Sequence, residues 1–597
     1  MLKGLAFAAF FIGLLSLQQS LTTAFAQDSD PPTRVARINY VQGSVSFQPG
    51  GEGDWVSAVP NRPLTTGDNL WTDKDSRSEL HIGSTAFRMS SETSLTFLNL
   101  DDHTVQLRLS LGSLIINVRH LDDDEVFEID TPNLALSLLR TGEYRVDVNG
   151  DGNEATVTAW RGRGEVSGGG SSYTVIGGQQ ARFSGTDRLG YDIAEVPGND
   201  DFDNWAFERD RREDGAASAN YVSQDLTGYE DLDDYGHWRY VAGYGPVWAP
   251  AAVPVGWAPY RFGHWVWIDP WGWTWVEDEP WGFAPFHYGR WAFVDSGWCW
   301  VPGPVFVRPV YAPALVVFVG GAEGFRVSGG AGVAWFPLAP GEVYVPGYRA
   351  SRTYINNVNI TNTVVNVTKV TNVYNTTINK TNVTRISYVN QRQPNAVTAV
   401  SRETFVNARP VAKSLAQVNP KEVADAPVTH IASVQPGRAS VMGAGTPARA
   451  KPPASIASRQ VIARRTPAPP VAAFEQRQNS SSRSGQSSAN VREPAPRQPE
   501  VPRPNDSRAA PRPPAMARGE ESDIATRVPE VPRSQQPRAA QDSEEPARQN
   551  ETWSHPLARP APPVQEKTPG QMREEENKFN GWQQQHERSV PRPEPRR

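Results

Sequence analysis

The residue pattern that most directly suggests chemistry is a short acidic loop. Asp147, Asn149 and Asp151, followed by Gly152, match the first positions of a calcium-binding loop, in which alternate side chains supply oxygen ligands. The twelfth position of such a loop requires a bidentate acid, and Thr158 stands there. The same residues also predict a β-hairpin, because Asn-Gly and Asp-Gly pairs tolerate the positive φ of tight turns. The hairpin is the favoured interpretation, and calcium binding is the alternative.

Tryptophan is the second unusual feature of the chain. There are 19 Trp, and twelve of them lie between Trp238 and Trp300. Exposed Trp and Tyr rings can stack on sugars or surround quaternary ammonium groups, so this region predicts either an aromatic core or a ligand-binding surface. The candidates for ligand binding are the aromatic residues outside the expected strand alternation, together with one Tyr beside them: Trp257, Tyr260, Trp271 and Trp281.

The Trp-rich region is repetitive, and its period indicates hairpins. A Gly-His/Arg-Trp-x-aromatic pattern begins at Gly236, Gly263 and Gly289, which makes three units of about 26 residues. Within the middle unit, Trp265 and Trp267 alternate along one expected strand and two more Trp alternate along the next. A hairpin of this length is not stable alone, so we expect the copies to bury a shared aromatic core.

Motifs for catalysis are weak throughout the sequence. His237 and His264 occupy equivalent repeat positions, but the third copy has Arg290, which disfavours a repeated metal site. Cys299 lies between two Trp, and no motif places a base beside it. Hydrolysis would need facing carboxylates in the Trp-rich region, for which the candidates are Asp269, Glu277 and Asp295. We therefore expect no enzyme activity, no cofactor and no metal beyond the weak calcium candidate.

Composition limits the fold and the partners of the 597-residue chain. Hydrophobic residues make up 38%, and the chain has 52 Pro and 49 Gly, so part of it is expected not to fold. Cys299 is the only cysteine, which excludes an intramolecular disulfide. The 59 basic and 65 acidic residues give a net charge of −6, which provides no basis for a nucleic-acid partner.

The N-terminus predicts export. Lys3 precedes an apolar run from Leu5 to Leu17, and Ala24-Phe25-Ala26 has the small-x-small form of a cleavage site. This is the pattern of a secretory signal peptide over residues 1–26, whose apolar run is short for a bilayer span. We expect an exported protein of the periplasm, cell surface or extracellular space, with no transmembrane helix once the signal is cleaved.

Residues 34–197 are expected to form an antiparallel β module, because short runs of alternating hydrophobicity are separated by turn clusters. Several blocks in this region also resemble the FecR domain, in the order in which that family has them. The blocks are Gly43-Ser44-Val45, Leu64–Thr72, Ser91–Leu95, Arg140–Val146 and Trp160-Arg161-Gly162. The family's best-known members are envelope signal transducers with a cytoplasmic anti-sigma segment and one membrane helix before this domain. Here the expected signal peptide stands directly before it, so the resemblance implies an extracytoplasmic β interaction module.

The remaining sequence divides by composition. We expect a linker at 198–227, a Trp/Gly/Pro-rich β-repeat domain at 228–350, an extended Asn/Thr/Val-rich segment at 351–434 and a disordered Pro/Arg/Gln-rich tail at 435–597. The repeat domain is similar to uncharacterised Trp-rich regions that follow FecR-like domains. It also resembles, more distantly, the cell-wall-binding repeats of bacterial surface proteins.

Together these patterns predict a mainly β, exported and non-catalytic envelope protein that acts in scaffolding or recognition. The alternative is a carbohydrate- or cell-wall-binding protein that uses exposed Trp of the repeats. Envelope signal transduction and hydrolysis are weaker alternatives. The expected partner is an envelope protein or a cell-wall polysaccharide.

Overall fold

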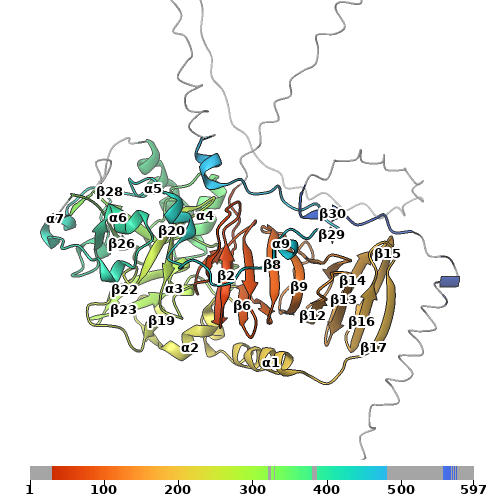
Figure 1. Cartoon of the computed structure of the whole chain (residues 1–597). Coiled ribbons are helices and arrows are strands. Elements are labelled where there is room, and N and C mark those ends of the chain that lie inside the picture. The colour runs from red at the N-terminus through yellow and green to blue at the C-terminus, as the bar shows by residue number, and fades with distance from the viewer. Residues whose placement is uncertain are drawn as a thin grey trace, which may run out of the picture. The chain divides into compact units, whose positions relative to one another are not determined.

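The computed structural model describes the regions in which both expected β modules fall (Figure 1). The described residues are 30–320, 325–327, 330–379, 386–479 and 555–565, with 568, 570–571 and 573. The predicted signal peptide at 1–26 and most of the predicted disordered tail, at 480–554 and 574–597, lie outside the described residues. The chain divides into two compact units, and the first, Met1–Arg477 with Trp553–Arg597, contains everything described below.

The first module consists of two β layers that share one strand. Sheet A contains β1, β4, β6, β7, β9, β12, β13, β16 and β17, and sheet B contains β2, β3, β5, β8, β9, β10, β11, β14 and β15. All pairings are antiparallel except that of β9 with β10. The strands are β1 (Ala36–Gln42), β2 (Val45–Gln48), β3 (Val56–Ser57), β4 (Pro63–Leu64), β5 (Asn69–Thr72), β6 (Arg77–Ile82), β7 (Thr85–Met89), β8 (Thr93–Leu100), β9 (Thr104–Val118), β10 (Val126–Asp130), β11 (Ala135–Leu138), β12 (Gly142–Val148), β13 (Glu154–Ala159), β14 (Arg163–Gly168), β15 (Ser171–Ile176), β16 (Gln179–Ser184) and β17 (Gly190–Glu195).

The core of this module lies between the two sheets, as the alternation predicted. On β9, Val105, Leu107 and Leu109 are fully buried in the core cluster. The residues between them, Gln106 and Arg108, therefore project from the other face of sheet B, because successive side chains of a strand point to opposite faces. The predicted mainly β, antiparallel fold class is confirmed.

The Trp-rich module contains the three predicted hairpins. In the middle hairpin, Trp265 pairs with Trp275 and Trp267 with Trp273 across the strands. The first and third hairpins join into a four-stranded sheet, and the middle hairpin forms a sheet of its own. The elements are β18 (Gly236–Val241), β19 (Gly245–Pro250), β20 (Gly263–Ile268), β21 (Gly272–Glu277), α3 (Ala284–His287), β22 (Arg290–Val294) and β23 (Gly297–Val301). Both sheets contribute Trp to one aromatic cluster, so the shared core is confirmed.

The segment 351–434 is not the extended arm that its composition predicted. Ser351 caps α4, in which Tyr354, Ile355 and Val358 are buried, and a second helix follows. The elements from 316 onward are β24 (Val316–Val319), β25 (Phe325–Val327), β26 (Gly330–Pro337), α4 (Arg352–Ile360), α5 (Val367–Asn379), η4 (Asn390–Arg392), β27 (Thr398–Ser401), α6 (Arg402–Val406), η5 (Val411–Lys413), α7 (Pro420–Ala424) and β28 (Val428–Thr429). Burial of one apolar helix face outweighs the low helix propensity of Asn, Thr and Val, which composition alone does not reveal.

The predicted linker at 198–227 is also wrong, because it contains a capped helix. Asp200 accepts the backbone N–H groups of Phe202 and Asp203, and the Asp203 side chain accepts the N–H of Asp200. This capping box starts α1 (Asp201–Asp214), which is followed by η1 (Ala217–Asn220), η2 (Tyr229–Asp231) and α2 (Leu232–Tyr235). Buried Phe202 and Ala206 pack with Ile115 of β9, which holds α1 on the first module.

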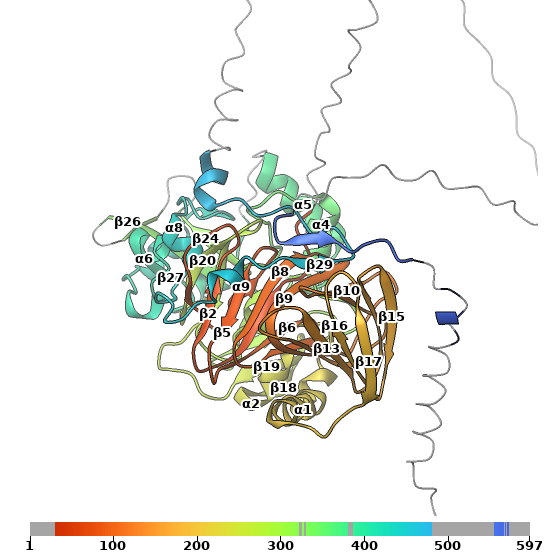
Figure 2. The same cartoon turned by 45° about the vertical axis from the view of Figure 1, so that its right-hand side comes forward.

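The predicted disordered tail begins too early. Residues 438–477, here called the strap, run across sheet B of the first module (Figures 1 and 2). The strap contains α8 (Arg438–Met442), α9 (Ala454–Ala457) and β29 (Val461–Ala463), and β29 pairs in parallel with β30 (Ala558–Pro560). Low hydrophobicity predicted disorder here, but polar side chains of the sheet hold the strap by its main chain. Among the described residues, none of the helices combines the length and the hydrophobicity needed to span a bilayer.

In the Trp-rich module, replacing a buried ring should lower the free energy of unfolding much more than replacing an exposed ring. Trp265 is 1% exposed and meets Trp275 edge-on at 5.4 Å, so we expect Trp265→Ala to lower the free energy of unfolding by about 3–5 kcal/mol. Tyr240→Ala, at a side chain 79% exposed on β18, should change it by no more than about 0.5 kcal/mol. Urea denaturation measures both, and equal effects would contradict the assignment of the core.

Candidate functional site

The four aromatic residues predicted to bind a ligand are buried. The exposed fractions are 7% for Trp257, 0% for Tyr260, 4% for Trp271 and 1% for Trp281. Trp257 packs on Trp291 with 5.4 Å between the ring centroids. The expectation that they are exposed is therefore wrong. These residues lie on loops that turn inward, and strand alternation does not determine where a loop side chain points.

The acidic loop forms the predicted hairpin. β12 and β13 pair in register on either side of the turn that contains Asn149 and Asp151. The Asp147 carboxylate accepts a hydrogen bond from the Ser113 hydroxyl at 2.6 Å and forms an ion pair with Arg145 at 2.9 Å. Asp147 is thus bound to its strand neighbours instead of being grouped with the turn residues.

The three carboxylates considered for hydrolysis do not meet. Asp269 and Glu277 lie at opposite ends of the β20–β21 hairpin, and Glu277 is only 1% exposed. Asp269 pairs with Arg477 at 2.8 Å, and Asp295, in the third hairpin, pairs with Arg239 at 3.0 Å. No shared pocket places these groups on either side of one bond.

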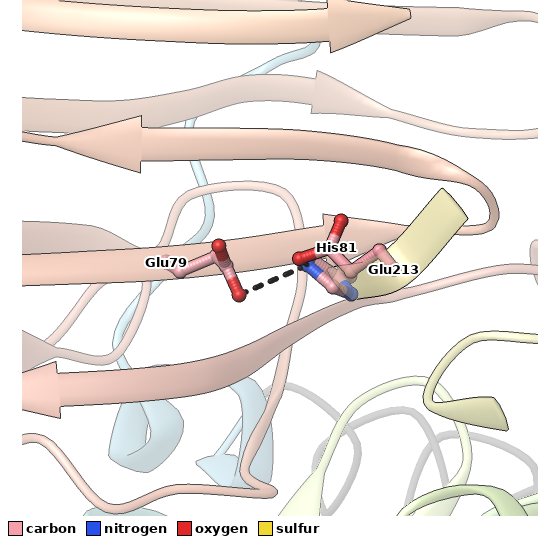
Figure 3. A group of neighbouring side chains, drawn as sticks. All are labelled: Glu79, His81 and Glu213. Atoms are coloured by element: carbon pink, nitrogen blue, oxygen red, sulfur yellow. Dashed lines mark ion pairs between the residues drawn. The ribbon is translucent and has the colours of Figure 1, made fainter. Parts of the chain in front are cut away.

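The structure instead brings together a cluster of buried charges where β6, α1 and η2 meet. Figure 3 shows three of its members, Glu79, His81 and Glu213. His81 of β6 lies at its centre, with Nδ1 2.5 Å from the Glu230 carboxylate of η2. Its Nε2 is 3.2 Å from Glu79, also on β6, and 3.5 Å from Glu213 on α1. All four residues are at most 5% exposed, so water screens these interactions little.

Arginines fill the other side of the cluster. Arg88 of β7 is fully buried and contacts Glu79 at 2.6 Å, Asp210 at 2.8 Å and Glu213 at 3.1 Å. Arg209 of α1 binds Glu79 with both Nε and Nη2. One β-hairpin and one helix therefore share their charges in a single network, and Glu79 accepts from both.

The buried part of the network is neutral only when His81 is protonated. Its members whose side chains are less than a quarter exposed are the carboxylates Glu79, Asp210, Glu213, Glu230 and Asp231 and the guanidinium groups Arg37, Arg88, Arg119 and Arg209. The more exposed Arg212, Asp214 and Asp234 extend the network to the surface. Five negative and four positive groups leave one negative charge, which an imidazolium at His81 neutralises. Because an uncompensated buried charge costs several kcal/mol, charge balance favours the protonated histidine.

The pKa values agree with this balance. Burial by itself lowers the pKa of His81, but the Glu230 and Glu213 carboxylates outweigh burial and raise it well above its ordinary value. Burial likewise opposes ionisation of Glu230, yet His81 and Arg37 lower its pKa to about 2. The charged forms are therefore the stable ones at neutral pH.

Three of these residues also have the composition of a metal site. Possible ligand atoms of Glu79, His81 and Glu213 lie within 4.8 Å of one another. However, Arg88 and Arg209 already bind the same carboxylates, so a divalent cation would add charge to a network that is already neutral. The donor set therefore fits an ion-pair network better than a metal centre.

A second set of contacts joins the first module to the Trp-rich module. Arg37 of β1 is 1% exposed and donates to Asp231 at 2.6 Å and to the carbonyl of Pro280 at 2.7 Å. It also donates to the side-chain oxygen of Asn61, whose amide donates to the carbonyl of Glu279 at 2.7 Å. Buried polar groups of one module are thus satisfied by the main chain of the other, which fixes their relative placement.

A cavity of about 270 Å³ lies between the two modules. We call it the cleft. The first module, the turn of the β20–β21 hairpin and the strap each supply part of its wall. The residues that define its chemistry are Arg34, Arg62, Asp68, Trp267, Trp271 and Arg477.

The cleft combines an aromatic wall with cationic groups. Arg62 donates one Nη to the carbonyl of Val441, and its Nε has no hydrogen-bond partner among the described residues. Arg34 binds Glu125 and likewise keeps one Nη without such a partner. Trp267 is only partly buried and forms part of the wall. The lining also includes the carboxylates of Asp68 and Asp269, so the cleft presents both signs of charge beside an aromatic surface.

Comparison with known proteins gives a family without an assigned function. Residues 229–342, about a fifth of the chain, match a family of unknown function, DUF6600. No curated protein matches the chain. Two crystal structures of a protein from Parabacteroides distasonis ATCC 8503, described provisionally as an anti-sigma factor, are similar at 14% and 13% identity. Each similarity covers 21% of this chain and 59% of that one, with a TM-score of 0.20.

Sequence reasoning missed the charged cluster because three of its members lie in the expected linker. Arg209, Asp210 and Glu213 belong to α1, and the only local signal for that helix was the Asp200–Asp203 capping box. His81 and Glu79 alternate on one strand, which placed them on the same face without indicating a partner.

Stability should depend on His81 and on pH. Removing its charge leaves a buried carboxylate uncompensated, so we expect His81→Gln to lower the free energy of unfolding by about 3–5 kcal/mol at pH 6. Because the folded-state pKa is raised, this contribution is complete below the unfolded value of about 6.5 and is lost as pH rises through the folded value. Chemical denaturation from pH 6 to pH 10 should therefore show the two proteins converging at alkaline pH.

An exposed histidine provides the control for this measurement. His103, whose side chain is 68% exposed, should change the free energy of unfolding by no more than about 0.5 kcal/mol when replaced by Gln. A constant difference between the native protein and His81→Gln across the pH range would contradict the assigned role of His81.

The ion-pair interpretation also predicts the response to metals. We expect the melting temperature to stay the same after dialysis against EDTA and after addition of Zn²⁺, because the guanidinium groups already neutralise the carboxylates. Differential scanning calorimetry measures this. A rise with Zn²⁺ that His81→Gln abolishes would make the cluster a metal site.

Proposed function

We propose that this chain is an exported, non-catalytic protein of the cell envelope that acts in recognition or scaffolding. The proposal is supported by the signal-peptide pattern, by the FecR-like blocks of the first module and by the burial of most of the repeat Trp in a packed core. Signal transduction and hydrolysis gain no support from the charged cluster or from the separated carboxylates.

The observation that carries the proposal is the junction between the modules. Arg37 and Asn61 are buried and satisfied across it, so the two modules hold one relative placement and the cleft between them exists before any ligand arrives. A preformed site loses little conformational entropy when it binds, which suits a recognition protein.

The cleft favours one ligand class for a recognition role. Its partly exposed Trp267 offers an aromatic surface on which a sugar ring can stack, and the positive charges of Arg34 and Arg62 in the wall favour an anionic substituent. An acidic cell-wall saccharide combines both features. This is the carbohydrate-binding alternative of the sequence analysis, with the cleft as the binding site in place of the buried Trp residues.

Binding of cell-wall fragments tests the saccharide assignment. We expect soluble peptidoglycan fragments or acidic glycans on an array to bind the native protein, and Trp267→Ala to weaken binding at least tenfold without loss of fold. Tyr240→Ala, an exposed aromatic residue outside the cleft, is the matched control and should bind as the native protein does.

The outcomes separate the two roles. Equal binding by Trp267→Ala and the native protein, or no binding at all, would eliminate the saccharide role. Capture of a specific envelope protein by crosslinking in the producing cells, with no saccharide binding, would support scaffolding. Failure of both experiments would contradict the proposed function.

A further inference from the structure

The outward face of sheet B carries a row of polar residues that are buried. These residues alternate with core residues and therefore project away from the core. The row runs across neighbouring strands and consists of Ser46, Thr96, Arg108, Gln106, Asp130, Glu128 and Ser137. Each is at most 9% exposed, although it lies on the outside of the module. Charged side chains such as Glu128 and Arg108 are rarely buried on an outer face, so the covering segment needs an explanation.

The strap covers this row, and the sheet holds it by its main chain. Arg108 donates to the carbonyl oxygens of Ala457 at 2.9 Å and of Arg459 at 3.0 Å. Gln106 donates to the carbonyl of Arg465 at 2.9 Å. The sheet therefore recognises carbonyl groups that any extended peptide would present.

The backbone N–H groups of the strap also find acceptors on the first module. Glu128 accepts the backbone N–H groups of Arg464 at 2.8 Å and Arg465 at 3.0 Å. The N–H of Ile462 donates to the carbonyl of Thr131 at 2.8 Å. The first module thus supplies both donors and acceptors to the main chain of the strap, as happens when a peptide is added to a protein surface by main-chain hydrogen bonds.

The core of the first module does not need the strap. The buried members of its core cluster all come from residues 36–189, and Met442 of the strap only packs at the edge. The strap's own contact cluster on the sheet is small, with Val461 and Ala463 against Leu98 and Ala558. Since the covered side chains are polar, water could solvate them if the strap left, which makes the contact exchangeable.

Charge adds a preference for basic peptides. The strap has seven basic residues and one acidic residue. Arg438 pairs with Asp54 at 2.7 Å, and Arg464 pairs with Glu165. Carboxylates of the first module thus meet arginines at both ends of the contact.

We propose that the outer face of sheet B is a docking surface for an extended, basic peptide segment of a partner protein, and that the strap occupies it within the same chain. The partner segment replaces the strap by making the same main-chain hydrogen bonds, and the acidic residues at Asp54 and Glu165 select for Arg and Lys. The strap competes at the high effective concentration of a tethered segment, so the surface responds only to partners that are abundant or tightly bound.

A labelled peptide tests this on the full chain. The probe is a fluorescent peptide with the sequence of residues 444–465, and the strap is weakened by Arg438→Glu with Arg464→Glu. We expect this double variant to bind the peptide at least tenfold more tightly than the native protein. A composition-matched scrambled peptide should bind within about threefold because recognition is by the main chain, and a peptide with Glu in place of its Arg and Lys should not bind. Fluorescence anisotropy measures all three.

The matched control is Arg392→Glu with Arg409→Glu. Both arginines are exposed and pair with surface carboxylates that do not belong to sheet B, so the net charge changes equally and binding should stay at the native level.

Variants of the sheet keep the proposal falsifiable. On the weakened background, Arg108→Met should reduce binding at least tenfold because two donors to the strap are lost. Glu165→Gln, at a side chain that is 28% exposed and does not support the core, should also reduce it, and it does not rebuild an ion pair with the Glu at position 464 of the weakened strap.

Three results would overturn the proposal. These are equal binding by the weakened and native proteins, binding that ignores both sheet variants, and absence of binding to the weakened protein. A concentration-dependent dimer of the weakened protein in sedimentation velocity, with no peptide binding, would assign the surface to a second copy instead.

Discussion

The arrangement of this protein depends on the neutrality of one buried network of charges. His81 supplies the last positive charge among carboxylates contributed by β6, α1 and η2. None of these elements could bury its charges alone, because each would leave a carboxylate or a guanidinium without a partner. The helix therefore stays on the sheet, and the turn at 229–231 leads the chain into the Trp-rich module from a fixed position. The positions of the cleft and of the aromatic core depend on this fixed entry point.

Aromatic packing stabilises the second module without a covalent cross-link. The only cysteine is buried, so stability must come from contacts. Edge-to-face pairs such as Trp265 with Trp335 bury large areas at low cost in side-chain entropy. A ring that fills the core in this way is not available to a ligand. The partly exposed Trp267 is placed differently from its neighbours because it lies at the edge of the core cluster.

Sequence patterns predicted what depends on local periodicity. The alternation of Trp265 and Trp267 gave the hairpin and its face, and the Asn149–Asp151 turn gave its hairpin. Sequence patterns did not predict the structure of segments whose conformation depends on contacts with distant parts of the chain. The Asn/Thr/Val run at 352–360 became a helix because Tyr354 and Val358 found an apolar surface, and the strap has a defined path because Arg108 and Glu128 hold its main chain. Trp271 shows the same limit, since its loop position suggested exposure and tertiary contacts buried it.

The long strand β9 has a mechanical consequence for the first module. Its 15 residues pair with β7 and β12 in one sheet and with β8 and β10 in the other. The part of β9 up to Leu111 pairs in sheet B and the part from Gly112 pairs in sheet A, so one continuous strand passes from one layer to the other. The two layers should open together, and the amides of β9 should exchange with solvent more slowly than those of edge strands such as β17. A single strand thus makes a two-layer module behave as one cooperative body.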